Sequence, residues 1–211
     1  MSVVVAQALL EIGAVGFSVQ APITFKSGIV SPVYVDNRKL PYYPKQWQII
    51  IEGFQDVITS NVLPYDVIAG VAAGGIPHSS ALGYSLQRPS VFVRKEAKGH
   101  GKGKRVEGGD IDGQRVLLVE DLVTTGGSSL SGVEALRDEG GIVTDLIAIV
   151  SYGFEEAREN FMAAAVNLKT LTTFDIILGV ALDQGQFTAS EHDIITDWFN
   201  DPHGWGDRHS S

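Results

Sequence analysis

The fold of this chain is decided by the stretch VLLVEDLVTTGGSS, which spans residues 116–129. Its first residues are apolar and partly β-branched, which is typical of a buried strand in a parallel sheet. We expect this strand over residues 114–120, ending on the adjacent carboxylates Glu120 and Asp121. A helical pattern begins near Ser128, after a short turn of Thr and Gly residues. The stretch therefore predicts a strand that leads directly into a helix at the edge of a parallel sheet.

The turn between this strand and helix predicts an anion site. The first N–H groups of a helix lack partners within the helix, and its N-terminal end carries partial positive charge. The two carboxylates before the turn suit a different part of the ligand, namely sugar hydroxyls and a magnesium-bound substrate. No Lys follows the glycines as in a Walker A loop, and the spacing is not that of a dinucleotide-binding turn. The pattern favours a phosphoribosyl ligand over the alternative, an ordinary helix cap after an acidic strand end.

Strand and helix patterns alternate after about residue 44, which predicts βαβ units and a mainly parallel sheet. Strands are expected over residues 66–70, 90–94, 114–120, 142–151 and 168–171, and helices over 1–10, 45–60, 76–86, 128–139, 154–166, 174–182 and 189–199. We predict one domain over residues 1–211. Its parts are a small N-terminal lobe (1–42) covering the carboxyl edge of the sheet, an α/β core with closing helices (43–200), and a frayed tail (201–211).

Composition excludes several classes of protein. The chain has 211 residues and no cysteine, which rules out disulfides, thiol catalysis and a cysteine-based zinc site. Its formal net charge of −9 argues against broad nucleic-acid binding. No apolar stretch is long enough to span a bilayer, and the N-terminus lacks the basic start of a signal peptide. We therefore expect a cytoplasmic protein without a nucleic-acid or membrane partner.

A basic segment over residues 94–109 opposes this acidic balance. Six of the chain's 16 Lys and Arg residues fall within residues 94–105, and the interleaved glycines exclude a stable helix. Long loops in compact domains tend to bind ligands, so we predict that this loop covers a pyrophosphate. In that arrangement the lysines of the loop supply charge to the leaving group and His100 donates a proton or a hydrogen bond. The alternative is a solvated run of surface charge.

Three segments, together with a short fourth one, resemble one enzyme family. Residues 120–128 are similar to the phosphoribosyl-pyrophosphate signature of the type I phosphoribosyltransferases. Residues 25–38 (FKSGIVSPVYVDNR) and 94–108 resemble the N-terminal signature and the catalytic loop of the orotate phosphoribosyltransferases, and residues 70–77 resemble the pyrophosphate-side loop. The resemblance implies an α/β fold of the type I phosphoribosyltransferase kind, a mainly parallel twisted sheet flanked by helices with a small N-terminal hood lobe. It also implies magnesium-dependent transfer of the phosphoribosyl group from 5-phosphoribosyl 1-pyrophosphate to orotate, giving orotidine 5-monophosphate and pyrophosphate, in the synthesis of UMP.

The resemblance also implies roles for individual residues. Glu120 and Asp121 bind the ribose hydroxyls, and the turn that follows them binds the 5-phosphate. The full set implied for phosphoribosyl pyrophosphate is Arg94, Lys95, Lys98, His100, Glu120, Asp121, Leu122, Val123, Thr124, Thr125, Gly126, Gly127 and Ser128. Orotate is implied to contact Lys26, Tyr34, Val35 and Thr124, and the catalytic residues are implied to be Lys98, His100 and Lys26. Magnesium is held mainly through substrate oxygens, and a homodimer places loop 94–108 in the neighbouring subunit's active site.

The chain departs from some members of that family at two positions. Gly74 stands where some members have a Lys, and residues 151–154 (SYGF) contain no Arg for the orotate carboxylate. We therefore expect Lys26 and backbone N–H groups to carry more of the carboxylate binding. Two alternatives share the phosphate site: a phosphoribosyltransferase for another nucleobase, and a non-catalytic regulator that senses phosphoribosyl pyrophosphate. The Lys26 segment argues against the first, and the acidic charge with the Lys98–His100 loop argues against the second.

Overall fold

Strand β8 (Arg115–Val123) lies inside a six-stranded sheet in the computed structural model, which describes residues 1–25, 27–61, 63–96 and 104–209. The strand order is β10-β9-β8-β5-β6-β7, and all neighbours are parallel except the last pair. The other strands of this sheet are β5 (Val67–Val71), β6 (Ser90–Val93), β7 (Val106–Glu107), β9 (Ile142–Ser151) and β10 (Asn167–Thr173). The predicted α/β class with a mainly parallel sheet is confirmed.

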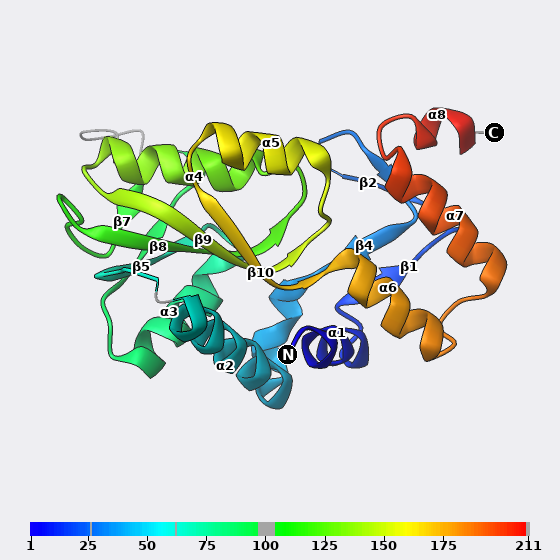
Figure 1. The fold of residues 1–211 in the computed structure, drawn as a ribbon, viewed down its shortest axis with the longest axis horizontal. Helices are drawn as coiled ribbons and strands as arrows, with labels where there is room; N and C mark the ends of the chain where they lie inside the picture. The colour runs from blue at the N-terminus through cyan, green and yellow to red at the C-terminus, as the bar shows by residue number, and fades with distance from the viewer. Residues whose placement is uncertain (26, 62, 97–103, 210–211) are drawn as a thin grey trace.

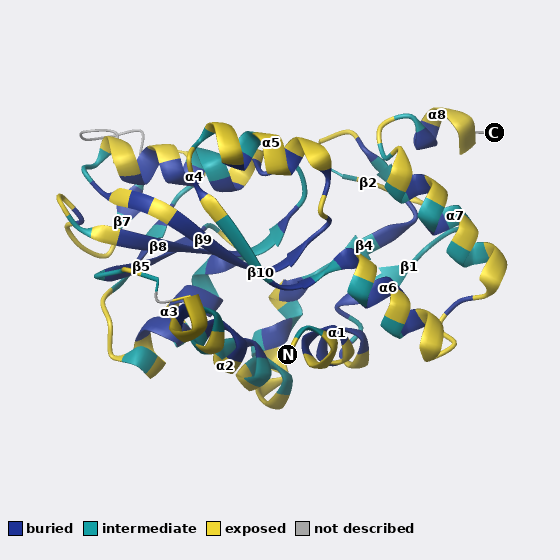
Figure 2. Cartoon of the chain, viewed as in Figure 1, coloured by how far each residue is buried: buried dark blue, intermediate teal, exposed yellow. Residues whose placement is uncertain are grey.

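Helices cover both faces of this sheet (Figure 1). Helices α4 (Gly127–Asp138) and α5 (Glu155–Ala163) lie on one face, and α2 (Pro44–Asn61) and α3 (Gly75–Leu86) lie on the other. The central strands are buried on both sides, whereas the helices expose their outer faces (Figure 2). This double cover explains why β5 and β8 are almost continuously apolar rather than alternating.

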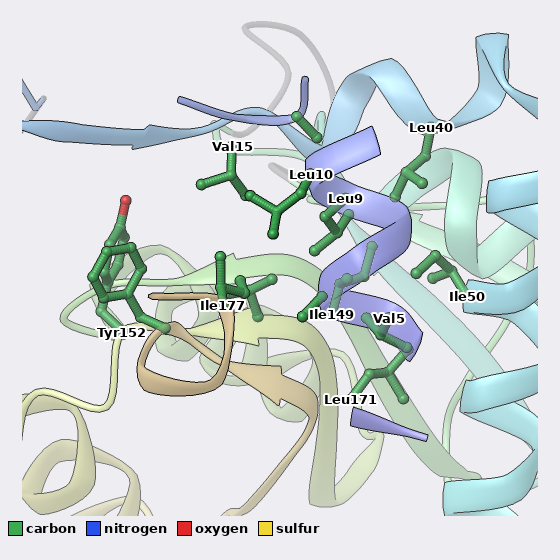
Figure 3. Packing of buried hydrophobic residues seen from close by; sticks show 14 of the residues in the cluster. Val5, Leu9, Leu10, Val15, Leu40, Ile50, Ile149, Tyr152, Leu171 and Ile177 are labelled. Carbon is green, nitrogen blue, oxygen red and sulfur yellow. The ribbon is translucent and has the colours of Figure 1, made fainter. Parts of the chain in front are cut away.

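The N-terminal lobe and the C-terminal helices gather beyond one end of the sheet (Figure 1). The lobe holds two antiparallel pairs, β1 (Val15–Phe17) with β4 (Val33–Val35) and β2 (Ile23–Thr24) with β3 (Val30–Ser31). It is flanked by α1 (Ser2–Glu11), the 3₁₀ helix η1 (Asn37–Tyr42), α6 (Phe174–Asp183), α7 (Ala189–Asn200) and α8 (Trp205–His209). One continuous apolar cluster joins Leu9 of α1, Ile149 of β9 and Ile177 of α6 (Figure 3). The lobe therefore shares its core with the sheet.

Three expectations about the elements are corrected. Strand β8 continues three residues past Glu120, because Leu122 and Val123 pair with Val150 and Ser151 of the long strand β9. The basic segment is not one uninterrupted loop, since β7 at its end pairs with Phe92 and Val93 of β6. The tail, which was expected to be frayed, is folded as far as residue 209. It forms α8, in which Trp205 is 1% exposed.

Candidate active site

The predicted anion turn forms the wall of a cavity of about 310 Å³. It is lined by Phe25, Ser27, Leu122, Thr124, Thr125, Gly126, Gly127, Ser128 and Ser129. Gly126 has a φ of +87°, and a Cβ there would lie 2.9 Å from the ring of Phe161. Glycine is needed for both reasons, and the resulting turn lets the 12-residue helix α4 begin at Gly127 with its first N–H groups at the cavity. Asn160 of α5 steadies the turn by donating to the Thr125 carbonyl over 3.1 Å.

The acidic pair lies at the same edge of the sheet as this turn. Glu120 is 5% exposed and accepts a 3.3 Å hydrogen bond from Ser129 Oγ. Burial, with the charge of Asp121 as a smaller cause, raises the pKa of Glu120 from its ordinary value of 4.5 to about 8. Burial also raises the pKa of Asp121. The ligand-free site therefore holds a proton on Glu120 at neutral pH, which a bound cation would displace.

The carboxylate of Asp121 packs against the turn that follows β5. A Cβ built on Gly74 would lie 2.2 Å from Asp121 Oδ1, and one on Gly75 would lie 2.4 Å from the Val119 carbonyl oxygen. Any side chain at position 74 would thus require Asp121 to move. In this chain, therefore, the glycine that stands where some family members have a Lys leaves the space that the Asp121 carboxylate occupies.

The described part of the basic segment lies beside α4. Arg94 and Lys95 follow β6 and line a second cavity of about 180 Å³ together with Val71, Arg105, Ser128 and Ser131. Ser128 borders both cavities, so the expected phosphate turn and these cations are neighbours. The charge of Lys95 also acts on Glu120, whose pKa it lowers slightly against the effect of burial. Lys98 and His100 lie outside the described residues.

The predicted orotate contacts are brought together only in part. Thr124 lines the larger cavity, whereas Tyr34 and Val35 of β4 are not among the described residues that line it. Tyr34 instead lies over Gly16 of β1, where a Cβ would be 2.2 Å from its ring. Lys26 lies outside the described residues, between Phe25 and Ser27, which both line the cavity.

Sequence reasoning missed two groups at this site. Asn37 is fully buried, and its Nδ2 donates to the Asp121 carbonyl over 2.6 Å, which fixes the hood lobe to the end of β8. Asn37 Oδ1 has no hydrogen-bond partner among the described residues. Ser129 was the second, and its position directly after the predicted phosphate set was the available signal. For Asn37 the sequence contains no such signal, because its hydrogen-bond partner lies 84 residues away in the chain.

Glu120 predicts a pH-dependent stability. The folded protein holds this proton up to about pH 8, whereas an unfolded chain releases it near 4.5, so the stabilisation is complete below 4.5 and is lost as the pH rises through about 8. Glu120→Gln removes the loss. We expect it to raise the free energy of unfolding of the ligand-free protein by on the order of 3 kcal/mol at about pH 9 and little at about pH 5, measured by urea unfolding.

The matched control is Glu134→Gln, since Glu134 is an exposed glutamate of α4. It should leave the pH dependence of unfolding unchanged. Equal pH slopes for the wild type and Glu120→Gln would contradict the assignment of a buried proton to Glu120.

Comparison with known proteins agrees with this geometry. The phosphoribosyl transferase domain family matches residues 47–183. The chain is 42% identical to an orotate phosphoribosyltransferase of Coxiella burnetii over 95% of this chain and 96% of that protein, and 41% identical to one of Bacillus caldolyticus over 96% and 98%. It resembles the crystal structure of an orotate phosphoribosyltransferase from Aeropyrum pernix with a TM-score of 0.75 and 30% identity, over 87% of this chain and 99% of that one.

These similarities extend over nearly the whole chain and include the hood lobe as well as the phosphate turn. They confirm the fold and the family expected from the sequence. No helix in the described ranges has the length and apolar character needed to cross a membrane. The chain belongs to the phosphoribosyl transferase domain family and, within it, to the orotate phosphoribosyltransferases, the pentosyltransferases of pyrimidine biosynthesis.

Proposed function

We propose that this enzyme transfers the phosphoribosyl group from phosphoribosyl pyrophosphate to orotate at the cavity beside α4, with Mg²⁺ bound mainly through the substrate. The observation that carries the proposal is the adjacency of the Gly126 turn and the Glu120–Asp121 pair at one sheet edge. The turn suits a 5-phosphate, and the carboxylates suit the ribose hydroxyls next to it.

The proposed reaction needs no protein nucleophile. The bond between ribose C1 and the pyrophosphate oxygen breaks, and pyrophosphate leaves with the bonding electron pair. The orotate ring nitrogen bonds to C1 and loses its proton, which the departing pyrophosphate takes up. Positive charge develops on the ribose ring, and we assign its stabilisation to the carboxylates of Glu120 and Asp121 once a bound cation has displaced the proton of Glu120. Arg94 and Lys95 supply positive charge on the pyrophosphate side. For Lys98 and His100 we propose the same leaving-group role, which rests on the family resemblance.

For the metal we propose that Mg²⁺ is held mainly through the substrate, with Glu120 and Asp121 beside it. Among the residues that the structure describes, no group of three or more His, Cys, Asp or Glu side chains could hold a metal ion. Glu120 and Asp121 provide two carboxylates beside the expected ribose, which suits Mg²⁺ because it retains substrate and water oxygens as ligands. When bound, Mg²⁺ would neutralise charge on the pyrophosphate.

We also propose a homodimer in which Lys98 and His100 of the segment 94–108 serve the neighbouring subunit, while Arg94 and Lys95 serve the phosphate turn of their own chain. The family resemblance of this segment supports the proposal. Service to an anionic substrate also accounts for the concentration of six Lys and Arg residues within residues 94–105 of a chain whose net charge is −9.

The function is tested by orotate consumption with purified protein, phosphoribosyl pyrophosphate and Mg²⁺, with adenine, guanine, xanthine and uracil in parallel. We expect loss of orotate that depends on both the cosubstrate and the metal. Turnover of another base instead would overturn the assignment of the base. Binding of phosphoribosyl pyrophosphate without any turnover would indicate the regulator.

Lys26→Ala tests how the orotate carboxylate is bound. Because the chain lacks the Arg found near residue 154 in some members, we expect the KM for orotate to rise about tenfold or more, as for loss of a charge-assisted hydrogen bond. The KM for phosphoribosyl pyrophosphate should change less. Steady-state kinetics measures both, and Lys45→Ala, an exposed lysine on α2, is the control. An unchanged orotate KM and turnover in Lys26→Ala would refute the role.

A further inference from the structure

The side chain of Glu139 binds the backbone at the end of the basic segment. Its Oε1 accepts from the N–H groups of Arg105 and Val106, over 2.8 Å and 3.0 Å. Its Oε2 lies 3.7 Å from Lys104 Nζ, and the Glu139 side chain is only 15% exposed. A carboxylate that accepts two backbone N–H groups in a shielded place makes strong, directional contacts.

Arg105 extends this attachment to the cations at the end of β6. The Arg105 Nε donates to the Arg94 carbonyl over 2.8 Å, and the Arg94 N–H donates to the Arg105 carbonyl over 2.9 Å. The Arg105 Nη1 donates to both the carbonyl and the Oγ of Ser131, each over 3.0 Å. The backbone that carries Arg94 and Lys95 is therefore tied to Arg105, which is itself held by Glu139 and by Ser131 of α4.

One helix connects these contacts to the phosphate turn. Glu139 is the C-cap residue of α4, Ser131 lies one turn into it, and Gly126 precedes its first residue. The cavity of about 180 Å³ lies between the first turn of α4 and the tied cations. Since a helix of 12 residues moves as a unit, its two ends set the distance between the phosphate turn and the cations.

We propose that Glu139 is a positioning residue for pyrophosphate: it holds Arg105, and through Arg105 it keeps Arg94 and Lys95 facing the phosphate turn. The proposal rests on the function proposed above for Arg94 and Lys95. Glu139 touches no substrate in this arrangement. Its effect is to remove conformational freedom from cations that would otherwise lose entropy when the anion binds.

Glu139→Ala is expected to raise the Kd of magnesium pyrophosphate and the KM for phosphoribosyl pyrophosphate about tenfold, because two backbone N–H groups lose their acceptor and the cations lose their fixed position. The KM for orotate should stay within about twofold. Glu139→Gln should restore most of the affinity, since an amide oxygen still accepts from Arg105 and Val106. Isothermal titration with pyrophosphate and Mg²⁺, steady-state kinetics and thermal unfolding measure these quantities.

Two further variants keep the test decisive. Glu134→Ala removes an exposed charge from the same helix and should leave the pyrophosphate Kd unchanged. Ser131→Ala removes one acceptor of Arg105 and should raise the Kd in the same direction by about two- to threefold, which gives a result even where Glu139→Ala unfolds. An unchanged pyrophosphate Kd in both Glu139→Ala and Ser131→Ala would overturn the proposal. So would equal rises in the constants for both substrates in parallel with a lower melting temperature, because that pattern is simple destabilisation.

The proposed role of the cations is checked separately. An Arg94→Ala, Lys95→Ala double variant should weaken pyrophosphate binding more than Glu139→Ala does. If the double variant binds pyrophosphate normally, the anion assignment itself fails. If the double variant loses affinity while Glu139→Ala does not, only the positioning role of Glu139 is overturned.

Discussion

Asp121→Asn is expected to lower kcat/KM for phosphoribosyl pyrophosphate by about two to three orders of magnitude, because hydrogen bonds to a charged group contribute roughly 1.5–3 kcal/mol each and a ribose diol makes two. Asp121 follows Glu120 at the end of β8, and its carboxylate lies against Gly74. Asn keeps the shape of the side chain but removes the negative charge that would stabilise the positive charge on the ribose. Steady-state kinetics with orotate at saturation measures the change.

This variant should fold normally, which separates activity from stability. Burial already raises the pKa of Asp121, so a neutral amide should not lower the free energy of unfolding. Asp138→Asn, at an exposed position of α4, is the control and should retain wild-type kinetics. Full activity in Asp121→Asn would show that this carboxylate does not contact the ribose.

Trp198→Ala is expected to lower the free energy of unfolding by about 3–5 kcal/mol, the range for removal of a buried aromatic side chain. Trp198 is fully buried in α7. Its ring packs edge-to-face against Phe25, Tyr152 and Phe174, with centroids 5.6–6.3 Å away. Its Nε1 donates to the Val30 carbonyl of β3 over 2.9 Å, which ties α7 to the hood lobe. Chemical denaturation measures the loss.

Two comparisons show where this stability comes from. Trp198→Phe keeps most of the apolar contact and loses the hydrogen bond, so it should cost about 1–3 kcal/mol. Tyr84→Ala removes an aromatic side chain that is 81% exposed and should change stability by less than about 0.5 kcal/mol. A wild-type unfolding midpoint for Trp198→Ala would contradict the view that the C-terminal helices stabilise the hood lobe. Because Phe25 also lines the larger cavity, a lower affinity for phosphoribosyl pyrophosphate should accompany the loss of stability.

The elements with strong local patterns were predictable from the sequence. The strand at residues 142–151 has the predicted bounds, since it is a long β-branched run bounded by a Gly pair and by Gly153. The turn that begins α4 was predictable for the same reason, because the positive φ at Gly126 and the start of the helix at Gly127 depend on a few consecutive residues. Such features depend on interactions between near neighbours in the chain.

The structural differences all involve partners that are distant in sequence. Leu122 and Val123 extend β8 only because β9 is long enough to pair with them, and β7 exists only beside β6. The tail is ordered through residue 209 because Trp205 is buried and Gly206 packs against Val30, a residue of the hood lobe.

The sequence by itself determined the fold class, the family and the turn that begins α4, since periodicity, motifs and turn chemistry are properties of short segments. Tertiary structure alone decided how these parts meet. It placed Asn37 on the Asp121 carbonyl, Asp121 against Gly74, and Glu139 on the backbone of Arg105 and Val106. It also created the burial that raises the pKa of Glu120 to about 8. Burial and long-range hydrogen bonds depend on which surfaces the packed elements bring into contact. A pattern within a short segment of sequence does not specify those contacts.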